Sequence, residues 1–397
     1  MAGSPFQHRP FPERILAVIA ALTLAATACT APAPEHTAAD SGPSPSPTEH
    51  EPRTLSVLGA GDILVHESIW EQAEHDGGGE FDFAPMFEGV APVLDGADLA
   101  LCHLEVPLAP EEGPFSGYPV FSAPPQVAEG IAAAGYDGCS TASNHTLDTG
   151  EDGVVRTLEG LEEAGLGAAG SARTEEEAAT PQVYEVDPAE GGEPVPIAHL
   201  SYTYGFNGFL PPEGKEWMGN LIDEEAILDE AARAREAGAE IVVLSMHWGT
   251  EYAHTADETQ HELSDLATHD DIDLILGHHA HVVQSMERIE DHWVVYGVGN
   301  QLAGQSTPPI DSRREGIMAQ VAFTEVEPGE WESGALVAVP TWISLDPGIR
   351  LVNLAEALAD DALPAEDREV YQAAYDRILA HVDGLGVSAD PDFAMAG

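Results

Sequence analysis

The stretch Leu274–His281, which reads LILGHHAH, decides how the rest of the chain is interpreted. Leu274–Leu276 is short and wholly apolar, which is typical of a buried strand, and three histidines follow within four positions. In open α/β sheets, ligands bind beyond the carboxyl ends of the strands. On extended backbone, His279 and His281 would point to the same side, as two ligands of one centre require. The stretch therefore predicts a strand that ends at a ligand site.

Polar side chains also follow the other predicted strands. Those strands are Thr54–Gly59, Leu99–Leu104, Gly138–Ala142 and Ile241–Met246. The residues that follow them are Asp62, Glu105, Asn144 with His145, and His247. Each has a simpler explanation alone: an aspartate that caps a turn, an exposed strand glutamate, a turn asparagine, a packed core histidine. Their joint occurrence at successive strand ends favours one shared pocket.

The residue types at these strand ends indicate a metal site. Carboxylate, amide oxygen and imidazole groups form a mixed oxygen and nitrogen set that suits Mn, Fe or Zn. A thiolate-rich site is excluded, because Cys102 and Cys139 fall inside predicted strands and are interpreted as small core residues. The three cysteines of the chain are also too few for a disulfide framework.

Predicted helices alternate with these strands. Helical patterns occur at Pro124–Ala134, Asp152–Ala164, Asp223–Ala237, Asp257–His269 and Pro364–Leu385. Further strands are predicted at Trp293–Gly297 and Ile317–Phe323. Such alternation indicates an α/β fold in which helices cover the faces of a sheet.

The charge of the chain excludes several classes of partner. Its 397 residues carry 70 Asp and Glu against 14 Lys and Arg, which gives a formal net charge of −56. Nucleic acid is excluded as a partner, because its phosphates need a basic surface. Adhesion of the folded surface to anionic lipid is disfavoured for the same reason. Salt would screen the self-repulsion of so acidic a surface, so we expect the protein to be more stable at high salt.

The N-terminal segment is interpreted as a leader. Ile15–Ala26 is almost wholly apolar and follows Arg9 and Arg14, but it is too short to span a bilayer. It leads through small residues to Cys29, which is similar to a bacterial lipoprotein cleavage site; plain secretion is the alternative. We expect a leader over 1–29 and a flexible tether over 30–52. The protein would then be held at the outer face of the membrane through a lipid anchor alone.

Six motifs occur along the chain in a fixed order. They are Asp62, Leu104-Glu105, Ser143–Gly150, His247–Tyr252, Gly277–His281 and Tyr296–Asn300. Together they resemble the capsule synthesis protein CapA family, whose members are also called poly-γ-glutamate synthesis proteins, over Leu55–Gly304. The resemblance implies a branch of the calcineurin-like metallophosphoesterases, and with it a layered α/β/β/α sandwich and a two-metal site.

The resemblance also implies roles for individual residues. The implied metal ligands are Asp62 and His281 for one ion, Asn144, His247 and His279 for the other, and Glu105 as the bridge. His145 would act beside the metals as an acid or charge stabiliser. Asp148 and Glu251 are candidates for orienting ligand histidines, although Asp148 could equally cap the helix at Asp152–Ala164.

Two positions depart from the pattern. Leu64 stands where the superfamily has a histidine, so the first ion would lack a ligand unless His66 or water completes it. His103 stands where the family usually has asparagine before Leu104-Glu105. We expect a family domain over 53–345, followed by a C-terminal helical extension over 346–397.

Three classes of function agree with the sequence. The first is a surface metallohydrolase that acts on a phosphoester or on an amide of a cell-envelope polymer. The second is a non-catalytic assembly or export factor for such a polymer, in which a membrane synthase complex is a possible partner. The third, a secreted binding domain, leaves the histidine cluster unexplained.

Overall fold

A computed structural model describes residues 52–189, 191–305 and 311–397. The predicted leader and tether, including Cys29, lie outside the described residues, so those interpretations stay predictions. These described residues all belong to one unit, which contains two β-sheets. Within these residues, none of the helices is both long enough and apolar enough to cross a bilayer.

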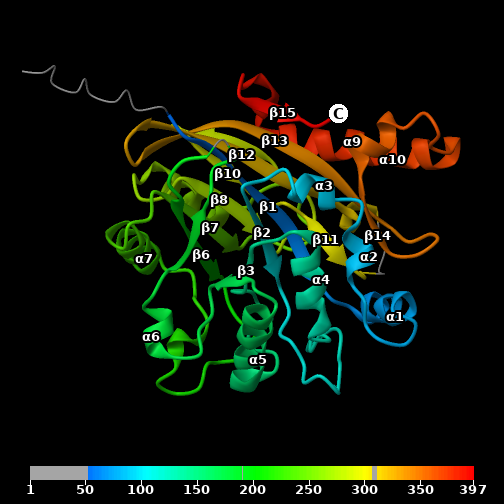
Figure 1. Cartoon of the computed structure of the whole chain (residues 1–397), viewed down its shortest axis with the longest axis horizontal. Helices are drawn as coiled ribbons and strands as arrows, with labels where there is room; N and C mark the ends of the chain where they lie inside the picture. Colours follow the sequence, from blue (N-terminus) through cyan, green and yellow to red (C-terminus); the bar gives the residue numbers. More distant parts are fainter. Residues whose placement is uncertain (1–51, 190, 306–310) are drawn as a thin grey trace, which may run out of the picture. The chain divides into compact units, whose positions relative to one another are not determined.

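The larger sheet has nine strands, and the first strand of the described chain lies in its middle (Figure 1). Its main path runs through β14 (Arg350–Asn353), β13 (Glu330–Ser344), β12 (Glu315–Glu327), β1 (Thr54–Leu64), β2 (Leu99–Leu104), β3 (Gly138–Ser140) and β4 (Gly167–Ala169). Two further strands pair outside this path: β11 (Asn300–Ala303) with β1, and β15 (Phe393–Met395) with β13. Strands β1 to β4 are parallel, so their carboxyl ends lie at one edge.

The smaller sheet has six strands and supplies the histidine-rich strand ends. Its order is β5 (Gln182–Val186), β6 (Val195–Thr203), β7 (Ile241–His247), β8 (Leu274–His278), β10 (His292–Val295) and β9 (Met286–Ile289). Strands β6, β7 and β8 run parallel with register Thr203↔His247↔His278. The last residues of these strands therefore lie side by side.

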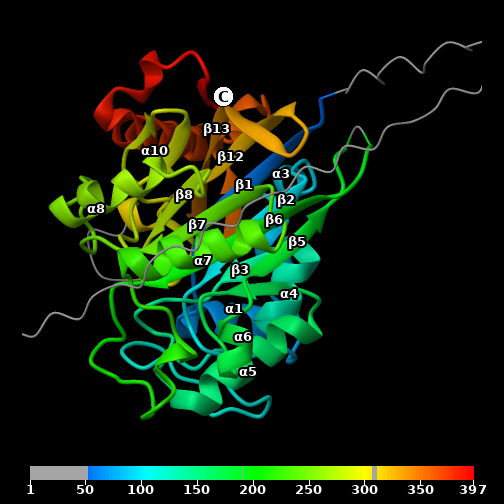
Figure 2. The ribbon, with the colours of Figure 1, turned by 90° about the vertical axis from the view of Figure 1, so that its left-hand side faces the viewer.

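The structure is layered, as the two views of the ribbon show (Figures 1 and 2), and clusters of apolar side chains join the layers. One cluster joins the larger sheet to α1 (Glu67–Asp76), α2 (Ala84–Phe87), α3 (Ala91–Leu94), α4 (Gln126–Ala134) and α5 (Gly150–Glu163). A second cluster lies between the two sheets, and a third joins the smaller sheet to α7 (Glu224–Glu236). The prediction of a layered α/β/β/α sandwich is confirmed.

The remaining helices are short or C-terminal: α6 (Glu175–Ala178), α8 (Glu258–Leu263), α9 (Leu354–Ala359) and α10 (Ala365–Val382). The helix predicted over Asp257–His269 is in fact α8 followed by a 3₁₀ segment at Ser264–Thr268. Ala374, Ile378 and Val382 of α10 pack into the cluster between the sheets. The proposed domain boundary at 345/346 stays a prediction, but β14 and β15 beyond it pair with β13 of the larger sheet.

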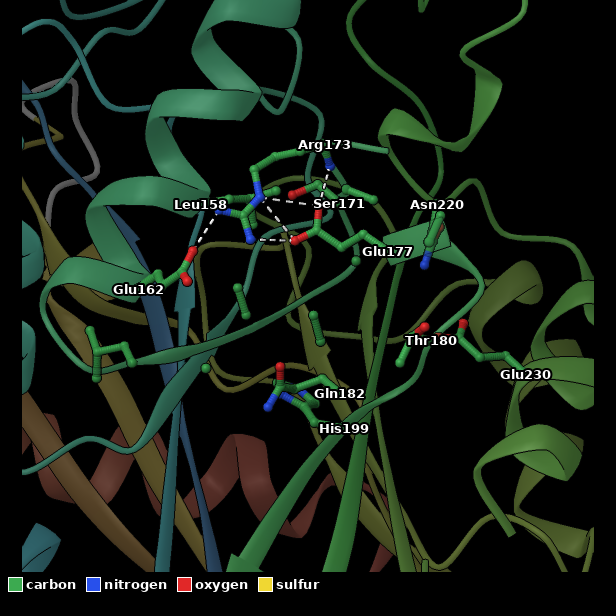
Figure 3. A pocket seen from close by; sticks show the side chains of 17 residues that line it. Leu158, Glu162, Ser171, Arg173, Glu177, Thr180, Gln182, His199, Asn220 and Glu230 are labelled. Atoms are coloured by element: carbon green, nitrogen blue, oxygen red, sulfur yellow. Dashed lines mark hydrogen bonds and ion pairs between the residues drawn. The ribbon is translucent and has the colours of Figure 1, made fainter. Parts of the chain in front are cut away.

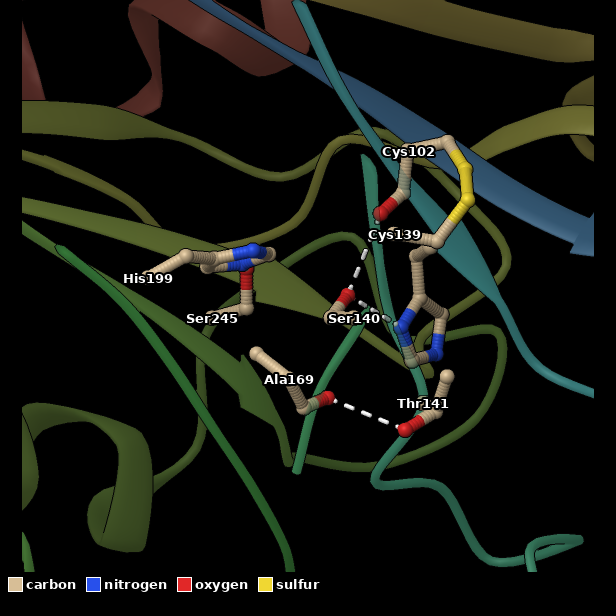
Figure 4. The surroundings of a disulfide bond; sticks show 8 residues. Cys102, Cys139, Ser140, Thr141, Ala169, His199 and Ser245 are labelled. Carbon is tan, nitrogen blue, oxygen red and sulfur yellow. Dashed lines mark hydrogen bonds between the residues drawn. A yellow bond between two sulfur atoms is a disulfide. The ribbon is translucent and has the colours of Figure 1, made fainter. Parts of the chain in front are cut away.

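The interpretation of Cys102 and Cys139 as small core residues inside strands is confirmed, but the bond between them was not predicted. Both are buried, but they form a disulfide between β2 and β3, with Cα atoms 4.4 Å apart (Figure 4). They are directly opposite each other in the register of these parallel strands, and His103 and Ser140 form the next opposite pair. The bond therefore ties together two strands immediately before they reach the predicted site.

Candidate metal centre

The predicted ligands converge at the carboxyl ends of strands from both sheets. Asp62 lies near the end of β1, Glu105 directly follows β2, and Asn144 lies in the loop after β3. His247 ends β7, and His279 and His281 follow β8. All six side chains are buried. The sequence predicts Asp62 just after its strand, but β1 continues to Leu64 because it pairs in parallel with β11 at Asp62↔Asn300.

The paired histidines reach the site by a different backbone route from the one predicted. His279 and His281 have φ angles of +82° and +56°, so this segment is left-handed rather than extended. Non-glycine residues seldom adopt such angles, and they cluster at functional sites when they do. The two ring centroids are 6.0 Å apart, so the turn still brings both imidazoles into one site.

Three of the residues form what we call the acidic half of the site: Asp62, Glu105 and His281. One ligand atom of each lies within 4.8 Å of the others. His281 Nδ1 is 3.1 Å from Asp62 Oδ2, and His281 Nε2 is 3.7 Å from Glu105 Oε1. Asn300 Oδ1 also lies 3.1 Å from His281 Nδ1 and thereby helps to fix the ring.

Opposite charges dominate the acidic half. Burial opposes ionisation of Asp62, but hydrogen bonds from His278 and His281 outweigh it and hold the pKa of this carboxyl well below its usual range. Burial raises the pKa of Glu105 to about 7, with Asp62 adding to the shift and His281 opposing it. Burial would lower the pKa of His281, but the Glu105 and Asp62 carboxylates raise it to about 9.

The other three residues form the neutral half: Asn144, His247 and His279. His247 Nε2 is 3.1 Å from Asn144 Oδ1, and the rings of His247 and His279 have centroids 4.7 Å apart. Burial, together with neighbouring histidines, lowers the pKa of His247 well below its usual value and that of His279 to about 3. Both imidazoles are therefore neutral and can donate a lone pair to a cation.

The Glu105 carboxylate provides the test of whether a metal fits this site. It is 1% exposed, and neither of its oxygens accepts a hydrogen bond from any of the described residues. A buried carboxylate without such partners is costly unless a cation compensates it. Glu105 belongs to the acidic half, and His281 beside it also neighbours His279 of the neutral half. The residues present therefore fit a divalent metal centre.

His145 and Asp148 form a buried pair beside the ligands. His145 Nδ1 lies 2.7 Å from Asp148 Oδ2, which also accepts a hydrogen bond from the Phe121 backbone N–H. The N-cap of α5 is Thr149, so Asp148 does not cap that helix. Asp148 instead fixes the His145 ring, and the roles given to both residues stay predictions.

The first departure from the family pattern, Leu64, is not compensated by His66. A β-bulge follows Asp62, and the Leu64 side chain packs in the apolar cluster with Ile63 and Val65. His66 packs edge-on against Phe121 and belongs to none of the groups that could hold a metal among the described residues. Neither position supplies the missing ligand.

His103 and His278, which the sequence interpretation left without roles, lie under the site. Asp62, His103 and His278 form another group whose ligand atoms lie within 4.8 Å of one another. The two rings are stacked, however, with centroids 4.2 Å apart and an interplanar angle of 18°. Because an imidazole lone pair lies in the plane of its ring, two parallel stacked rings do not converge on one ion. These side chains support the ligands instead.

Two tyrosines lie beside the ligand histidines, and the sequence analysis did not single out the first of them, Tyr204. Tyr204 lies 4.6 Å from His279 between ring centroids, and Tyr252 lies 5.9 Å from His281. The guanidinium of Arg313 lies 4.1 Å over the Tyr252 ring. Tyr252 belongs to one of the sequence motifs, and Glu251 beside it groups with His279 and His281 as a possible ligand. A loop tyrosine such as Tyr204 gives no sequence signal of this kind.

A separate cavity of about 300 Å³ lies near β4, α5 and α6 and contains none of the predicted ligands (Figure 3). The Arg173 side chain at this cavity forms ion pairs with Glu162 and Glu177. Its charge is therefore already compensated by side chains of the same cavity. The cavity and the metal centre are different features of the molecule.

Comparison with known proteins gives a family match over most of the structured chain. Residues 56–305 match the family described as bacterial capsule synthesis protein PGA_cap. The capsule biosynthesis protein CapA of Bacillus anthracis is 26% identical over 267 residues, covering 64% of this chain and 61% of that protein. The PGA biosynthesis protein CapA of Bacillus subtilis (strain 168) is 24% identical over 250 residues, covering 62% of each. The chain thus spans less than two thirds of the length of these relatives.

Solved structures with a similar arrangement were also found. The calcineurin-like phosphoesterase YfkN from Bacillus subtilis aligns with a TM-score of 0.45 and 14% identity, over 83% of this chain and 98% of that one. A 5'-nucleotidase precursor from Thermus thermophilus aligns with a TM-score of 0.44 and 15% identity, over 82% of this chain and 59% of that one.

Proposed function

The chain belongs to the bacterial capsule synthesis protein family PGA_cap, and from this premise we propose that it is a cell-surface metal-dependent hydrolase. Its site would hold two divalent ions, Mn, Fe or Zn, and act in the synthesis or export of a capsule or of poly-γ-glutamate. The substrate would be a phosphoester or an amide of a cell-envelope polymer. The observation that carries the proposal is the buried Glu105 carboxylate of the acidic half, neither oxygen of which accepts a hydrogen bond from the described residues.

The residues around the ligands would serve such a reaction. A bound divalent pair supplies Lewis-acid polarisation of a phosphoryl or carbonyl oxygen. His145 is held by Asp148 through Nδ1, which leaves Nε2 to donate a proton to a leaving group. Tyr204 and Tyr252, each less than half exposed, flank the histidines and offer walls for a substrate.

The acidity of the protein restricts how an anionic polymer can bind. With a formal charge of −56, the surface repels polyglutamate except where cations are present. Arg313, stacked on Tyr252 beside His281, provides one positive group next to the metal ligands. We therefore infer that an anionic polymer would contact this protein through the bound metal ions or local arginines rather than through the general surface.

The test combines metal content with turnover. Purified residues 53–397, loaded with Mn, Fe or Zn, should retain metal by elemental analysis and hydrolyse p-nitrophenyl phosphate. His145→Ala should lose turnover but keep its metal, because His145 is not one of the proposed ligands. A protein that binds none of these metals would refute the site, whereas bound metal without turnover would refute only the activity.

The second candidate function is a non-catalytic assembly or export factor for an envelope polymer. The observation that favours it is Leu64, whose side chain packs into the core and contributes no ligand. On this alternative, metal would stabilise the fold, and a membrane synthase complex would be the partner. Retained metal, absence of turnover on both phosphoester and amide substrates, and co-purification with membrane proteins would support it.

We also propose that the protein is anchored to the outer face of the membrane by a lipid at Cys29. The Cys102–Cys139 disulfide supports an extracytoplasmic location, because disulfides persist mainly in oxidising compartments. Cys29→Ala should move the protein from the membrane fraction to the soluble fraction. Membrane association that is unchanged in this variant would contradict the anchor.

A further inference from the structure

A row of buried hydrogen bonds runs from β3 through β2 to the neutral half of the site. Ser140 Oγ is 2.8 Å from His103 Nδ1, and His103 Nε2 is 2.9 Å from His247 Nδ1. The row ends where His247 Nε2 lies 3.1 Å from Asn144 Oδ1. Each of these side chains is at most 2% exposed. Both ring nitrogens of His247 therefore have a partner, and only Nε2 lies next to a predicted ligand, Asn144.

The contacts restrict where the hydrogens lie. The Cys102 carbonyl, which can only accept, is 3.3 Å from Ser140 Oγ, so the Ser140 hydroxyl has a partner to which it can donate (Figure 4). Ser140 Oγ can then accept from His103 Nδ1–H. A neutral His103 therefore presents a lone pair at Nε2, which accepts from His247 Nδ1–H. The remaining nitrogen of His247, Nε2, is left with its lone pair beside Asn144 Oδ1, which is also an acceptor.

Two acceptor atoms that face each other at 3.1 Å in a buried site suit a shared cation. The opposite direction of the row is the competing arrangement. In it, Ser140 donates to His103, His103 Nε2–H donates to His247 Nδ1, and His247 Nε2–H donates to Asn144. That arrangement would place a proton on His247 Nε2, where a metal needs a lone pair. The direction of the hydrogen bonds in the row therefore matters for metal binding.

The position of His103 is held from several sides. The Cys102–Cys139 disulfide joins the strands one residue before the opposite pair His103 and Ser140. On one face, the His278 ring stacks on His103 with centroids 4.2 Å apart, and His278 Nδ1 contacts Asp62 Oδ1 at 3.2 Å. His103 therefore cannot turn away from His247 without breaking the stack and the bond to Ser140.

We propose that His103 is a positioning residue, which with Ser140 holds His247 in the Nδ1–H tautomer and so presents the Nε2 lone pair to the cation of the neutral half. The inference rests on the proposed metal centre, and it adds to that centre a residue that none of the ligand assignments includes. Metal-binding histidines commonly depend on such outer partners for their orientation. Here the partner is a second histidine, His103.

The test compares two substitutions of His103. His103→Asn keeps a group near Nδ1 for Ser140 but leaves His247 Nδ1–H without its acceptor. His103→Gln can place its side-chain oxygen near the former Nε2 position and restore that acceptor. We expect His103→Asn to weaken Zn binding at the neutral half by about tenfold to a hundredfold. His103→Gln should recover most of this loss, which a role in packing alone would not produce.

A matched control is His199→Asn. His199 is also fully buried between the sheets and bonded to a serine, with Nε2 2.9 Å from Ser245 Oγ, but it lies outside the row. Its substitution should lower thermal stability without changing Zn affinity. Equal losses of affinity in His103→Asn, His103→Gln and His199→Asn would overturn the proposal.

A second measurement tests the tautomer without any metal. Nitrogen-15 NMR of histidine-labelled, metal-free protein, with His247 assigned through His247→Gln, should show His247 protonated at Nδ1 in the wild type. In His103→Asn, the Nδ1–H population should fall. A wild-type His247 protonated at Nε2 would overturn the positioning role even if metal binds. Wild-type protein that binds no Zn but shows the Nδ1–H tautomer would instead refute the metal centre and leave the hydrogen-bond row established.

Discussion

The acidic and neutral halves of the site differ in the charges that they hold when no metal is bound. In the acidic half, Asp62 and Glu105 are buried next to His281, whose pKa of about 9 keeps it protonated near neutrality. In the neutral half, burial and neighbouring rings hold His247 and His279 uncharged. Without metal, a proton on His281 therefore stands in for part of the positive charge of an ion. The neutral half has no such charge to displace.

The difference teaches that ligand residues alone do not define how a metal site behaves. A cation entering the acidic half must first displace a proton, whereas a cation entering the neutral half meets lone pairs that are already available. Glu105 is the residue assigned to both ions, so its substitution should affect metal binding in both halves at once.

The largest effect is expected for Glu105→Gln. This change keeps the size of the side chain but removes the anion proposed to bridge the ions, so both halves should lose metal. Elemental analysis should show a fall from about two ions per chain to nearly none. Glu258→Gln, at an exposed position on α8, is the control and should keep its metal. Unchanged stoichiometry in Glu105→Gln, with a native circular dichroism spectrum, would contradict the bridge.

Substitutions confined to one half should have an intermediate effect. Asp62→Asn should empty the acidic half, and His247→Ala should empty the neutral half, so each should retain about one ion per chain. Elemental analysis of the two variants, and of their double mutant, measures this directly. Loss of both ions from either single variant would show that the halves are not separate sites.

The pH dependence of binding should differ between the halves. His281, with a pKa of about 9, is protonated below that pH, so affinity at the acidic half should rise with pH up to about 9. The expected slope is up to about tenfold per pH unit for each proton displaced. His279, with a pKa of about 3, is already neutral, so affinity at the neutral half should stay flat above pH 6. Calorimetric titration of His247→Ala and Asp62→Asn in buffers of different ionisation enthalpy checks both expectations.

The smallest effect on metal is expected for Leu64→His, although it introduces the histidine that the resemblance led us to expect there. Because Leu64 is 2% exposed and packs in the core, the new imidazole would be buried without a designed partner. Stability should fall by about 1–3 kcal/mol, measured by urea unfolding, with no gain in metal. Leu64→Met, which roughly conserves volume, should cost less. A gain of metal affinity in Leu64→His would show that this side chain can turn into the site.

The strand ends and the layered fold could be predicted because periodic apolar runs and the polar residues that follow them are local properties of the sequence. Leu99–Leu104 is such a run, and β2 has the same bounds. The left-handed backbone at His279 and His281 could not be predicted, because it is set by the strands around it rather than by local preference. The stack of His103 on His278 depends on the packing of two sheets, which no local pattern encodes.

The disulfide was missed for a similar reason. Whether Cys102 and Cys139 can bond depends on the register of two parallel strands that are separated by a helix in the chain. A count of three cysteines says nothing about that register. Asp148 was left between two roles at the sequence level, and only its contact with His145 distinguished them.

The disulfide between Cys102 and Cys139 would be protected from wrong cysteine pairing by the proposed lipid on Cys29. Three cysteines allow three possible pairs, and two of those pairs would join Cys29 to the folded domain. A lipid attached to the Cys29 sulfur would remove both wrong pairs and leave Cys102–Cys139 as the single remaining connectivity. A chain processed in this order would have no disulfide isomers to sort, and the mature protein would contain no free thiol. Attachment of a lipid to Cys29 would then prevent wrong pairing of Cys102 and Cys139. The bond between these two cysteines joins the strands that carry His103 and Ser140.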